Sequence, residues 1–157
     1  MLTKGQMFSV DFLIACSIFL VMMIIIYLYW GYATLQIEDT VLTNDMTDKL
    51  NLASQAWFKE GTPKYWGSSD VVELGLSNGH SFNWTKMDLL KNSIGYGRAL
   101  TLIGVEEYYL YYRVANETNS TLFEFGDYPS NPDNVMKTER FGLLENSIAV
   151  VEVILWR

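Results

Sequence analysis

An uninterrupted apolar run near the N-terminus constrains this chain more than any other feature. No charged residue occurs from Phe12 to Leu35, and most of the run reads "FLIACSIFLVMMIIIYLYW". As an α-helix the run rises about 36 Å, enough to cross a hydrocarbon core of about 30 Å. The alternative is a helix in the core of a soluble domain, but the run has no polar face to turn toward solvent. We therefore expect a transmembrane helix.

The charges that flank the run predict its orientation. Lys4 is the only basic side chain before it, whereas four acidic residues follow it before Lys49. Because basic residues concentrate on the cytoplasmic side of membrane helices, the N-terminus is expected in the cytoplasm. Residues beyond about 36 are then extracellular, which makes the chain a single-pass protein of the cell membrane.

Composition constrains the function and the stabilisation of the residues outside the apolar run. The net charge is −7, which argues against nucleic-acid binding, because a phosphate-binding surface needs clustered Lys and Arg. The single cysteine, Cys16, lies inside the apolar run. The part outside the run therefore has no disulfide and no thiol chemistry, and its own core must stabilise it.

A helical rhythm continues beyond the apolar run. Apolar residues recur three, four or seven positions apart, at Leu35, Leu42, Met46, Leu50, Ala53 and Trp57. No proline occurs between Phe8 and Thr62, and Gly61 and Pro63 are typical of a helix end. The pattern predicts one long helix whose second half is amphipathic. Two helices with a hinge near Gly31 are the alternative.

The segment after this helix begins with short mixed elements. "DVVELGL", residues 70–76, favours a short strand. "FNWTKMDLLKNSIGYG", residues 82–97, predicts a helix with Asn83 as its N-cap. "RALTLIGV", residues 98–105, fits either a short helix or a strand.

The C-terminal third predicts strands. Residues 108–115 and 120–128 are strand-like and are expected to pair across a polar loop. Residues 138–144 and 148–156 flank Glu145-Asn146-Ser147, a hairpin turn. The fold class is therefore α+β, with an antiparallel sheet of about four strands and a helix packed on one face.

Three Asn-x-Thr sequons are candidates for glycosylation, at Asn83, Asn116 and Asn119. Asn116 and Asn119 share the polar loop "ANETNST", where an acceptor would be accessible. Because this loop is expected on the outer side of the membrane, we expect a surface glycoprotein.

Signatures of enzymes and metal sites are nearly absent from the sequence. The only histidine, His80, lies in a turn-like stretch and is expected to be a solvated loop residue. Four oxygen ligands in "FGDYPSNPDN" could approach calcium, at Asp127, Asn131, Asp133 and Asn134, but the spacing fits no EF-hand and favours a plain turn-rich loop. We expect no catalytic residue, no metal and no cofactor.

The junction before the apolar run carries a resemblance to a known family. "KGQ" at residues 4–6, followed by an apolar helix with Asp11 near its start, resembles the class III signal peptide of archaeal type IV prepilins. The resemblance implies cleavage by a prepilin peptidase between Gly5 and Gln6. The apolar helix is then kept, first as a membrane anchor and later as a packing helix among other pilin-like subunits.

Asp11 has a specific role in this interpretation. Cleavage creates a new ammonium group on Gln6 at the start of an apolar helix, and a buried ammonium requires an anion. Asp11 is the acid available near it, but pilins of this kind usually carry Glu as their fifth mature residue, and Asp11 would be the sixth. One extra residue turns the acid about 100° around the helix. This departure favours a minor pilin or pseudopilin over a major filament subunit.

Residues 61–157, the expected extracellular head, carry a second resemblance. "GTPKYWGSSDVVELGLS", "NWTKMDLL" and "LIGVEEYYLYY" occur in an order similar to that of archaeal membrane proteins with pilin-type leaders. The expected organisation has four parts: leader 1–5, transmembrane and assembly helix 6–36, amphipathic continuation 37–60 and extracellular head 61–157.

Two other functions stay open. One is an uncleaved single-pass protein whose glycosylated head binds a surface ligand or partner. The other is an ectoenzyme that uses Ser and acidic residues of the head, although no motif supports it.

Overall fold

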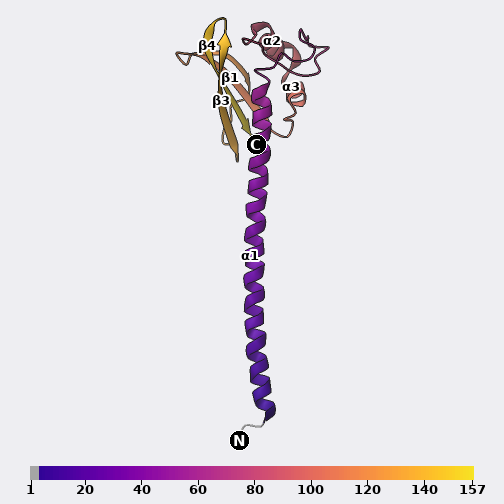
Figure 1. Ribbon diagram of the computed structural model, residues 1–157, viewed down its shortest axis with the longest axis vertical. Helices are drawn as coiled ribbons and strands as arrows, with labels where there is room; N and C mark the ends of the chain where they lie inside the picture. Colours follow the sequence, from indigo (N-terminus) through magenta and orange to yellow (C-terminus); the bar gives the residue numbers. More distant parts are fainter. Residues whose placement is uncertain (1–3) are drawn as a thin grey trace. The chain divides into compact units, whose positions relative to one another are not determined.

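The structure is a computed structural model that describes the backbone of residues 4–157 and the side chains of residues 10–157. It has the α+β layout expected from the sequence, a long N-terminal helix followed by short helices and a four-stranded antiparallel sheet (Figure 1). The chain divides into two units, Met1–Thr43 and Asn44–Arg157. Residues 1–3 of the expected leader lie outside the described residues.

The first helix, α1, is continuous from Lys4–Gln55. The prediction of one helix is confirmed, and the alternative of a hinge near Gly31 is wrong. The predicted end at Gly61 is also wrong, because the backbone after Gln55 bonds to a later segment instead of continuing the helix. The carbonyl of Ala56 accepts from the amide of Leu76 at 2.8 Å, and that of Lys59 accepts from Ser77 at 3.0 Å.

The second unit contains the sheet. Its strands are β1 (Tyr109–Asn116), β2 (Thr121–Gly126), β3 (Val135–Leu144) and β4 (Ser147–Trp156). All neighbours are antiparallel, in the spatial order β2-β1-β4-β3. The predicted pairings of β1 with β2 and of β3 with β4 are confirmed. The two edges of the sheet are therefore β2 and β3.

A two-residue turn sets the register of β3 and β4. Glu145 and Asn146 join β3 to β4 with φ values of 50° and 67°. Two consecutive residues with positive φ are typical of a type I′ hairpin, whose twist matches that of the strands. Ser147, expected in the turn, is the first residue of β4. The register then pairs Leu144 with Ser147 and Val135 with Trp156.

Three short helical elements precede the sheet: α2 (Trp84–Leu89), the π-helical η1 (Leu90–Ile94) and α3 (Tyr96–Ile103). Asn83 is the N-cap of α2, as predicted, and its Oδ1 accepts hydrogen bonds from the amides of Thr85 and Lys86. Most of residues 98–105, which fitted either a helix or a strand, form the C-terminal part of α3.

The predicted strand at residues 70–76 is wrong. This segment forms only one isolated bridge, between Glu73 and Thr62. Gly75 lies directly against the backbone of Gly61, where an added Cβ would come within 2.1 Å of the Gly61 nitrogen. The indole of Trp66 donates to the Gly75 carbonyl at 2.9 Å. Contacts between loops therefore satisfy this backbone in place of a ladder.

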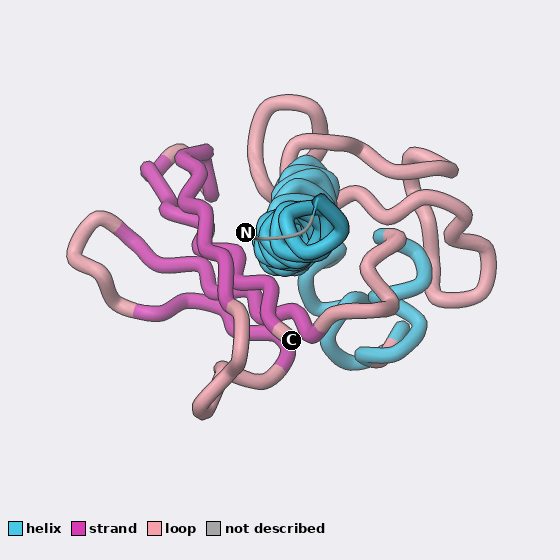
Figure 2. Tube along the Cα trace, turned by 90° about the horizontal axis from the view of Figure 1, so that it is seen from below, coloured by secondary structure: helices cyan, strands magenta, loops and turns pink. Residues whose placement is uncertain are grey.

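The core of the second unit forms around the last turns of α1. Figure 2 shows the sheet and the short helices on opposite sides of these turns, residues 44–55. Met46, Leu50 and Ala53 are buried, as the helical rhythm predicted, whereas Leu35 of the same pattern is 63% exposed. Trp57, fully buried, makes edge-on ring contacts with Tyr112, Phe82 and Phe123, with centroids 5.3–6.1 Å apart.

Candidate functional site

The apolar run occupies the part of α1 that belongs to the first unit. Its large apolar side chains from Phe12 to Leu35 are between 51% and 79% exposed. The most apolar 18-residue window of the helix has a mean hydropathy of 2.7, and none of it is buried. The helix is therefore long and apolar enough to cross a membrane. An exposed apolar surface of this extent requires cover from another source.

Polar groups inside this segment are satisfied locally. The hydroxyl of Ser17 donates to the Leu13 carbonyl at 2.8 Å, and that of Thr34 donates to the Trp30 carbonyl at 2.9 Å. Hydroxyls that bond one turn back on their own helix do not need water. The helix thus presents few unsatisfied groups to an apolar surrounding, which is what a bilayer requires.

Four aromatic residues gather near the C-terminal end of the apolar run, a feature that the sequence reasoning missed. Tyr27, Tyr29, Trp30 and Tyr32 are between 61% and 79% exposed. The hydroxyl of Tyr32 accepts a hydrogen bond from the amide of Gln36 at 2.7 Å. Tyr and Trp are enriched where membrane helices cross the headgroup level. Their spacing in "YLYWGY" was the signal available in the sequence.

The predicted processing site lies at the start of α1. Gly5 and Gln6 fall in its first turn, and their side chains lie outside the described residues. Asp11 is exposed and lies five residues after Gln6, a rise of about 7.5 Å along a helix. No ion pair joins Asp11 to another side chain among residues 10–157. Its expected role in charge pairing stays a prediction.

The three sequons differ in how firmly the fold holds the asparagine. The Nδ2 of Asn83, the atom that would carry a glycan, donates to Asn78 Oδ1 at 2.6 Å, while its Oδ1 caps α2. Asn116 and Asn119 use their Oδ1 atoms, toward the amide of Ser120 and toward Arg113 Nη2 respectively. Asn119 is also exposed. The loop of Asn116 and Asn119 is therefore the better acceptor region.

Lys86 is the most buried charged residue among the described side chains, with 4% exposure. Its Nζ donates to the carbonyls of Glu60 and Ser77, the latter at 2.8 Å. Burial lowers the pKa of this lysine, and the nearby Glu60 carboxylate partly opposes that shift. Because both of these bonds go to the backbone of loops around α2, Lys86 clamps the loops together. No pattern in the sequence predicts these contacts of Lys86.

Four tyrosines of the head, Tyr96, Tyr108, Tyr111 and Tyr112, have raised pKa values, mainly because they are buried. The pKa of Tyr108 is raised to about 12, and its hydroxyl donates to Asp45. The pKa of Tyr111 is also raised to about 12, and its hydroxyl donates to Glu124 at 3.0 Å. That of Tyr112 is raised by complete burial, and its hydroxyl donates to the Ala53 carbonyl. The hydroxyls of Tyr108, Tyr111 and Tyr112 therefore connect residues 108–112 to α1 and to β2.

A balanced group of charges crosses the face of the sheet that points away from α1. Glu152 of β4 pairs with Arg113 of β1 at 3.4 Å and with Lys137 of β3 at 3.2 Å, and Lys137 also pairs with Glu139 at 3.0 Å. Each charge therefore has an opposite neighbour. This arrangement links three strands across one face of the sheet and leaves no surplus charge to attract an ion.

No metal centre is assembled among the described side chains, residues 10–157. No group of three or more His, Cys, Asp or Glu residues there could hold a metal ion. His80 is exposed, as expected for a loop residue. In the loop considered for calcium, the amides of Asp133 and Asn134 donate to the Arg157 carbonyl.

No protein-family model matches this chain, and no curated protein or solved structure matches it. The family therefore stays a prediction that depends on the residues around Gly5 and on the pattern of the apolar helix.

Proposed function

We propose that this chain is a type IV pilin-like surface protein, a minor pilin or pseudopilin, that is anchored in the cell membrane with its N-terminus in the cytoplasm. A prepilin peptidase removes residues 1–5, and the apolar helix then packs with the helices of other pilin-like subunits. The second unit, beyond Thr43, is displayed outside the cell.

The observation that carries this proposal is an apolar helix whose whole circumference is exposed. Side chains from Phe12 to Leu35 point in every direction around α1, and none of the most apolar window is buried by the chain itself. Lipid can cover such a helix, and so can identical helices packed around it. A retained N-terminal helix that moves from membrane to filament needs both kinds of cover in turn.

The order of polar and apolar residues supports processing before the helix rather than after it. A secretory signal peptide is cut after its apolar region. Here Lys4, Gly5 and Gln6 precede that region, and α1 continues beyond it into the folded unit. A cut after the apolar region would divide α1, whereas a cut at Gly5 leaves nearly all of it intact.

The test is the intact mass of the chain recovered from membranes of cells that contain a prepilin peptidase. We expect loss of residues 1–5 and a mature N-terminus at Gln6. A chain that keeps Met1, or begins at Leu2, would contradict the proposal and support the uncleaved single-pass protein.

Two glycine variants supply the control. Gly5→Val places a side chain at the residue before the cut and is expected to leave the chain uncut. Gly31→Val changes a glycine of the same helix that has open space around it and is expected to be processed normally. Equal processing of both variants would show that cleavage does not depend on Gly5.

A further inference from the structure

Strand β3 leaves part of its backbone edge unpaired. The two-residue turn makes Leu144 and Ser147 a hydrogen-bonded pair, so alternate residues of β3, those with even numbers, bond to β4. The amides and carbonyls of the odd-numbered residues therefore point away from the sheet. Two observed contacts agree: Asn134 and Arg157 exchange both backbone bonds, and the carbonyl of Leu143 accepts from Phe82 outside the ladder.

The free part of the edge runs from Val135 to Phe141. No backbone hydrogen bond from another part of the described chain reaches the outward groups of residues 135, 137, 139 and 141. A groove of about 520 Å³, lined by Ser54, Gln55 and Phe58 on one side and by residues 139–141 on the other, lies beside its end. The chain thus leaves this edge accessible.

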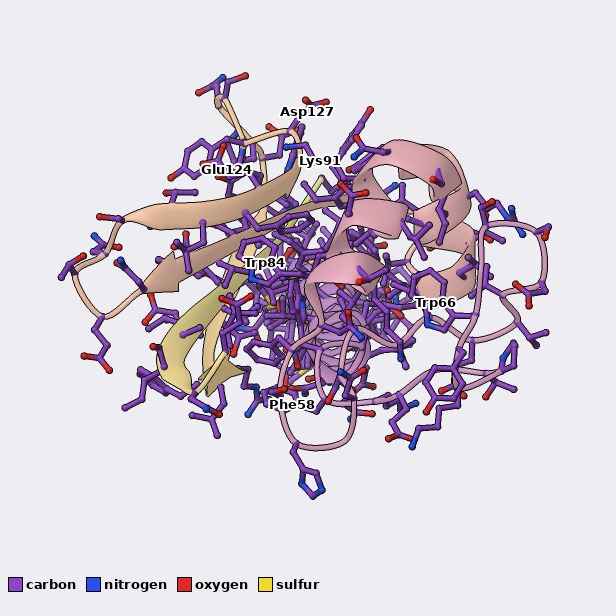
Figure 3. The ribbon with its side chains drawn as sticks, turned by 90° about the horizontal axis from the view of Figure 1, so that it is seen from above. Phe58, Trp66, Trp84, Lys91, Glu124 and Asp127 are labelled. Atoms are coloured by element: carbon purple, nitrogen blue, oxygen red, sulfur yellow. The ribbon has the colours of Figure 1, made fainter. Side chains whose placement is uncertain are left out.

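The opposite edge, β2, is different. Lys91 and Tyr96, from η1 and α3, line a hollow together with residues 124–127 of β2 and the loop after it (Figure 3). The ring of Tyr96 lies 5.7 Å from that of Phe125, and the Lys91 ammonium lies 5.8 Å from the ring of Phe123. Side chains therefore flank β2, whereas β3 has its free groups open along most of its length.

We infer that the edge of β3 binds the β3 edge of a second copy of this chain, antiparallel and about a twofold axis at Thr138. Positions at equal distances on either side of Thr138 carry side chains that complement each other. Lys137 then lies opposite Glu139 of the second copy, and Glu139 lies opposite Lys137 of the second copy. Val135 and Phe141, which are 51% and 69% exposed, lie opposite each other at both ends.

This register satisfies the edge in two ways. The outward-pointing residues face one another, so each directly opposed pair can exchange two backbone hydrogen bonds. Opposite charges and apolar pairs directly across an antiparallel ladder also stabilise it. Two copies therefore cover each other's free groups with complementary side chains.

The neighbouring registers lack this complementarity. With the axis at residue 137, Lys137 opposes Lys137 of the second copy, and Val135 opposes Glu139. With the axis at residue 139, Glu139 lies opposite Glu139 of the second copy, and Lys137 lies opposite Phe141. Like charges directly opposite each other destabilise a ladder, so the charges select the register centred on Thr138.

The pairing also sets the relative direction of the last turns of α1, residues 44–55, in the two copies. Thr47 contacts Met136 and Asn51 contacts Arg140, so the last turns of α1 advance in the same direction as β3. The twofold axis makes these turns of the two copies run in opposite directions.

A cysteine at the axis tests the pairing in the full chain, purified in detergent with Cys16→Ser as background. Position 138 would face itself in a non-hydrogen-bonded pair with Cα atoms about 4.5 Å apart, within the range for a disulfide. We expect Thr138→Cys to form a dimer on mild oxidation. Lys137→Cys, whose nearest equivalent lies diagonally at about 7–8 Å, is expected to cross-link much less.

Charge reversal tests the register without a covalent bond. Lys137→Glu and Glu139→Lys should each weaken dimerisation about tenfold, because each places like charges opposite one another. A mixture of the two single variants should recover it, since every opposed pair is again complementary. Recovery in the mixture also excludes misfolding of the variants as the cause of the loss, because each chain in the mixture is unchanged.

Two results would overturn the inference: equal cross-linking at positions 137 and 138, or no cross-linking at either. A mixture that dimerises no better than its components would overturn the register. Association through the apolar helix would not depend on these residues, so the experiment can fail while the proposed function stands. Detergent replaces the membrane, so a wrong membrane assignment leaves the expected cross-linking unchanged.

Discussion

The two units of this chain use apolar side chains in opposite ways. In Met1–Thr43 the large apolar residues from Phe12 to Leu35 are all more than half exposed, whereas in Asn44–Arg157 Met46, Leu50 and Trp57 are nearly or fully buried. One continuous helix contributes to both. Helix formation itself therefore does not distinguish the units, and the difference lies in what covers each surface.

That contrast separates two sources of stability. The second unit has a core of its own, in which the ring of Trp57 contacts those of Tyr112 and Phe123. The first unit has no such core among its described side chains, and its surface is stabilised only when lipid or other helices remove it from water. Substitutions should therefore affect folding in one unit and membrane or subunit contacts in the other.

A matched pair of tryptophans should give the largest difference between the units. Trp57→Ala removes a fully buried ring and should lower the free energy of unfolding of the second unit by about 3–5 kcal/mol. Trp30→Ala removes a ring that is 73% exposed and should change it by less than about 0.5 kcal/mol. Denaturant unfolding in detergent, followed by tryptophan fluorescence, measures both. Similar losses would erase the distinction between the units.

A charge in the middle of the apolar run tests the first unit alone. Ile25→Lys should disfavour membrane insertion by about 3 kcal/mol, the cost of a lysine at the centre of a spanning helix. Ile148→Lys, a surface change on β4, is the control and should insert normally, since Ile148 is 50% exposed. Extraction of the membrane fraction with alkaline carbonate reports the retained chain. Full retention of Ile25→Lys would contradict the membrane assignment.

Alkaline pH should affect the second unit through its buried tyrosines. The pKa values of Tyr108 and Tyr111 are raised to about 12, so between about pH 10 and 12 the unfolded chain releases protons that the folded chain retains. Stability is complete below pH 10 and falls as the pH rises to 12, on the order of 2 kcal/mol for one such group. The lowered pKa of Lys86 acts in the opposite direction, but through one group only.

Two tyrosine variants separate this effect from general alkaline damage. Tyr108→Phe should flatten the fall in stability above pH 10, whereas Tyr65→Phe should leave it unchanged because Tyr65 is 84% exposed. Unfolding at pH 9, 11 and 12 gives the slopes. If the unfolding free energy falls with pH equally in the two variants, Tyr108 does not cause the loss of stability above pH 10.

The smallest expected effect concerns Asn83, which the sequence marked both as a helix cap and as a sequon. Asn83→Ala should lower the unfolding free energy by about 1 kcal/mol, because the amides of Thr85 and Lys86 lose their acceptor. Thr85→Ala destroys the sequon but keeps the cap, and should be nearly neutral. A loss with Thr85→Ala equal to that with Asn83→Ala would assign the stability to the glycan rather than to the cap.

Local patterns in the sequence predicted the elements that depend on nearby residues. The continuous helix, the cap at Asn83 and the hairpin at Glu145 and Asn146 were all predicted from periodicity, capping and turn chemistry. The apparent strand at residues 70–76 was wrong because its apolar pattern serves loop contacts around Gly75. Such contacts depend on which distant backbone approaches, and a pattern along the chain does not contain that information.

The candidate site was less predictable than the fold. The apolar run was evident from composition, and its exposure agrees with the prediction of a transmembrane helix. The buried Lys86 and the free edge of β3 could not be predicted, because they depend on the order of strands in space and on the path of the loops. Gly5 and Gln6 remain predictions from a motif.

The most direct test of the account is the labelling of one cysteine in each unit with a membrane-impermeant maleimide on intact cells. Cys16 lies in the apolar run, and Ser130→Cys in a Cys16→Ser background places a thiol at an exposed position of the second unit. We expect rapid labelling at position 130 and none at position 16. Labelling at position 130 only after the cells are permeabilised, or labelling of Cys16 in intact cells, would contradict it.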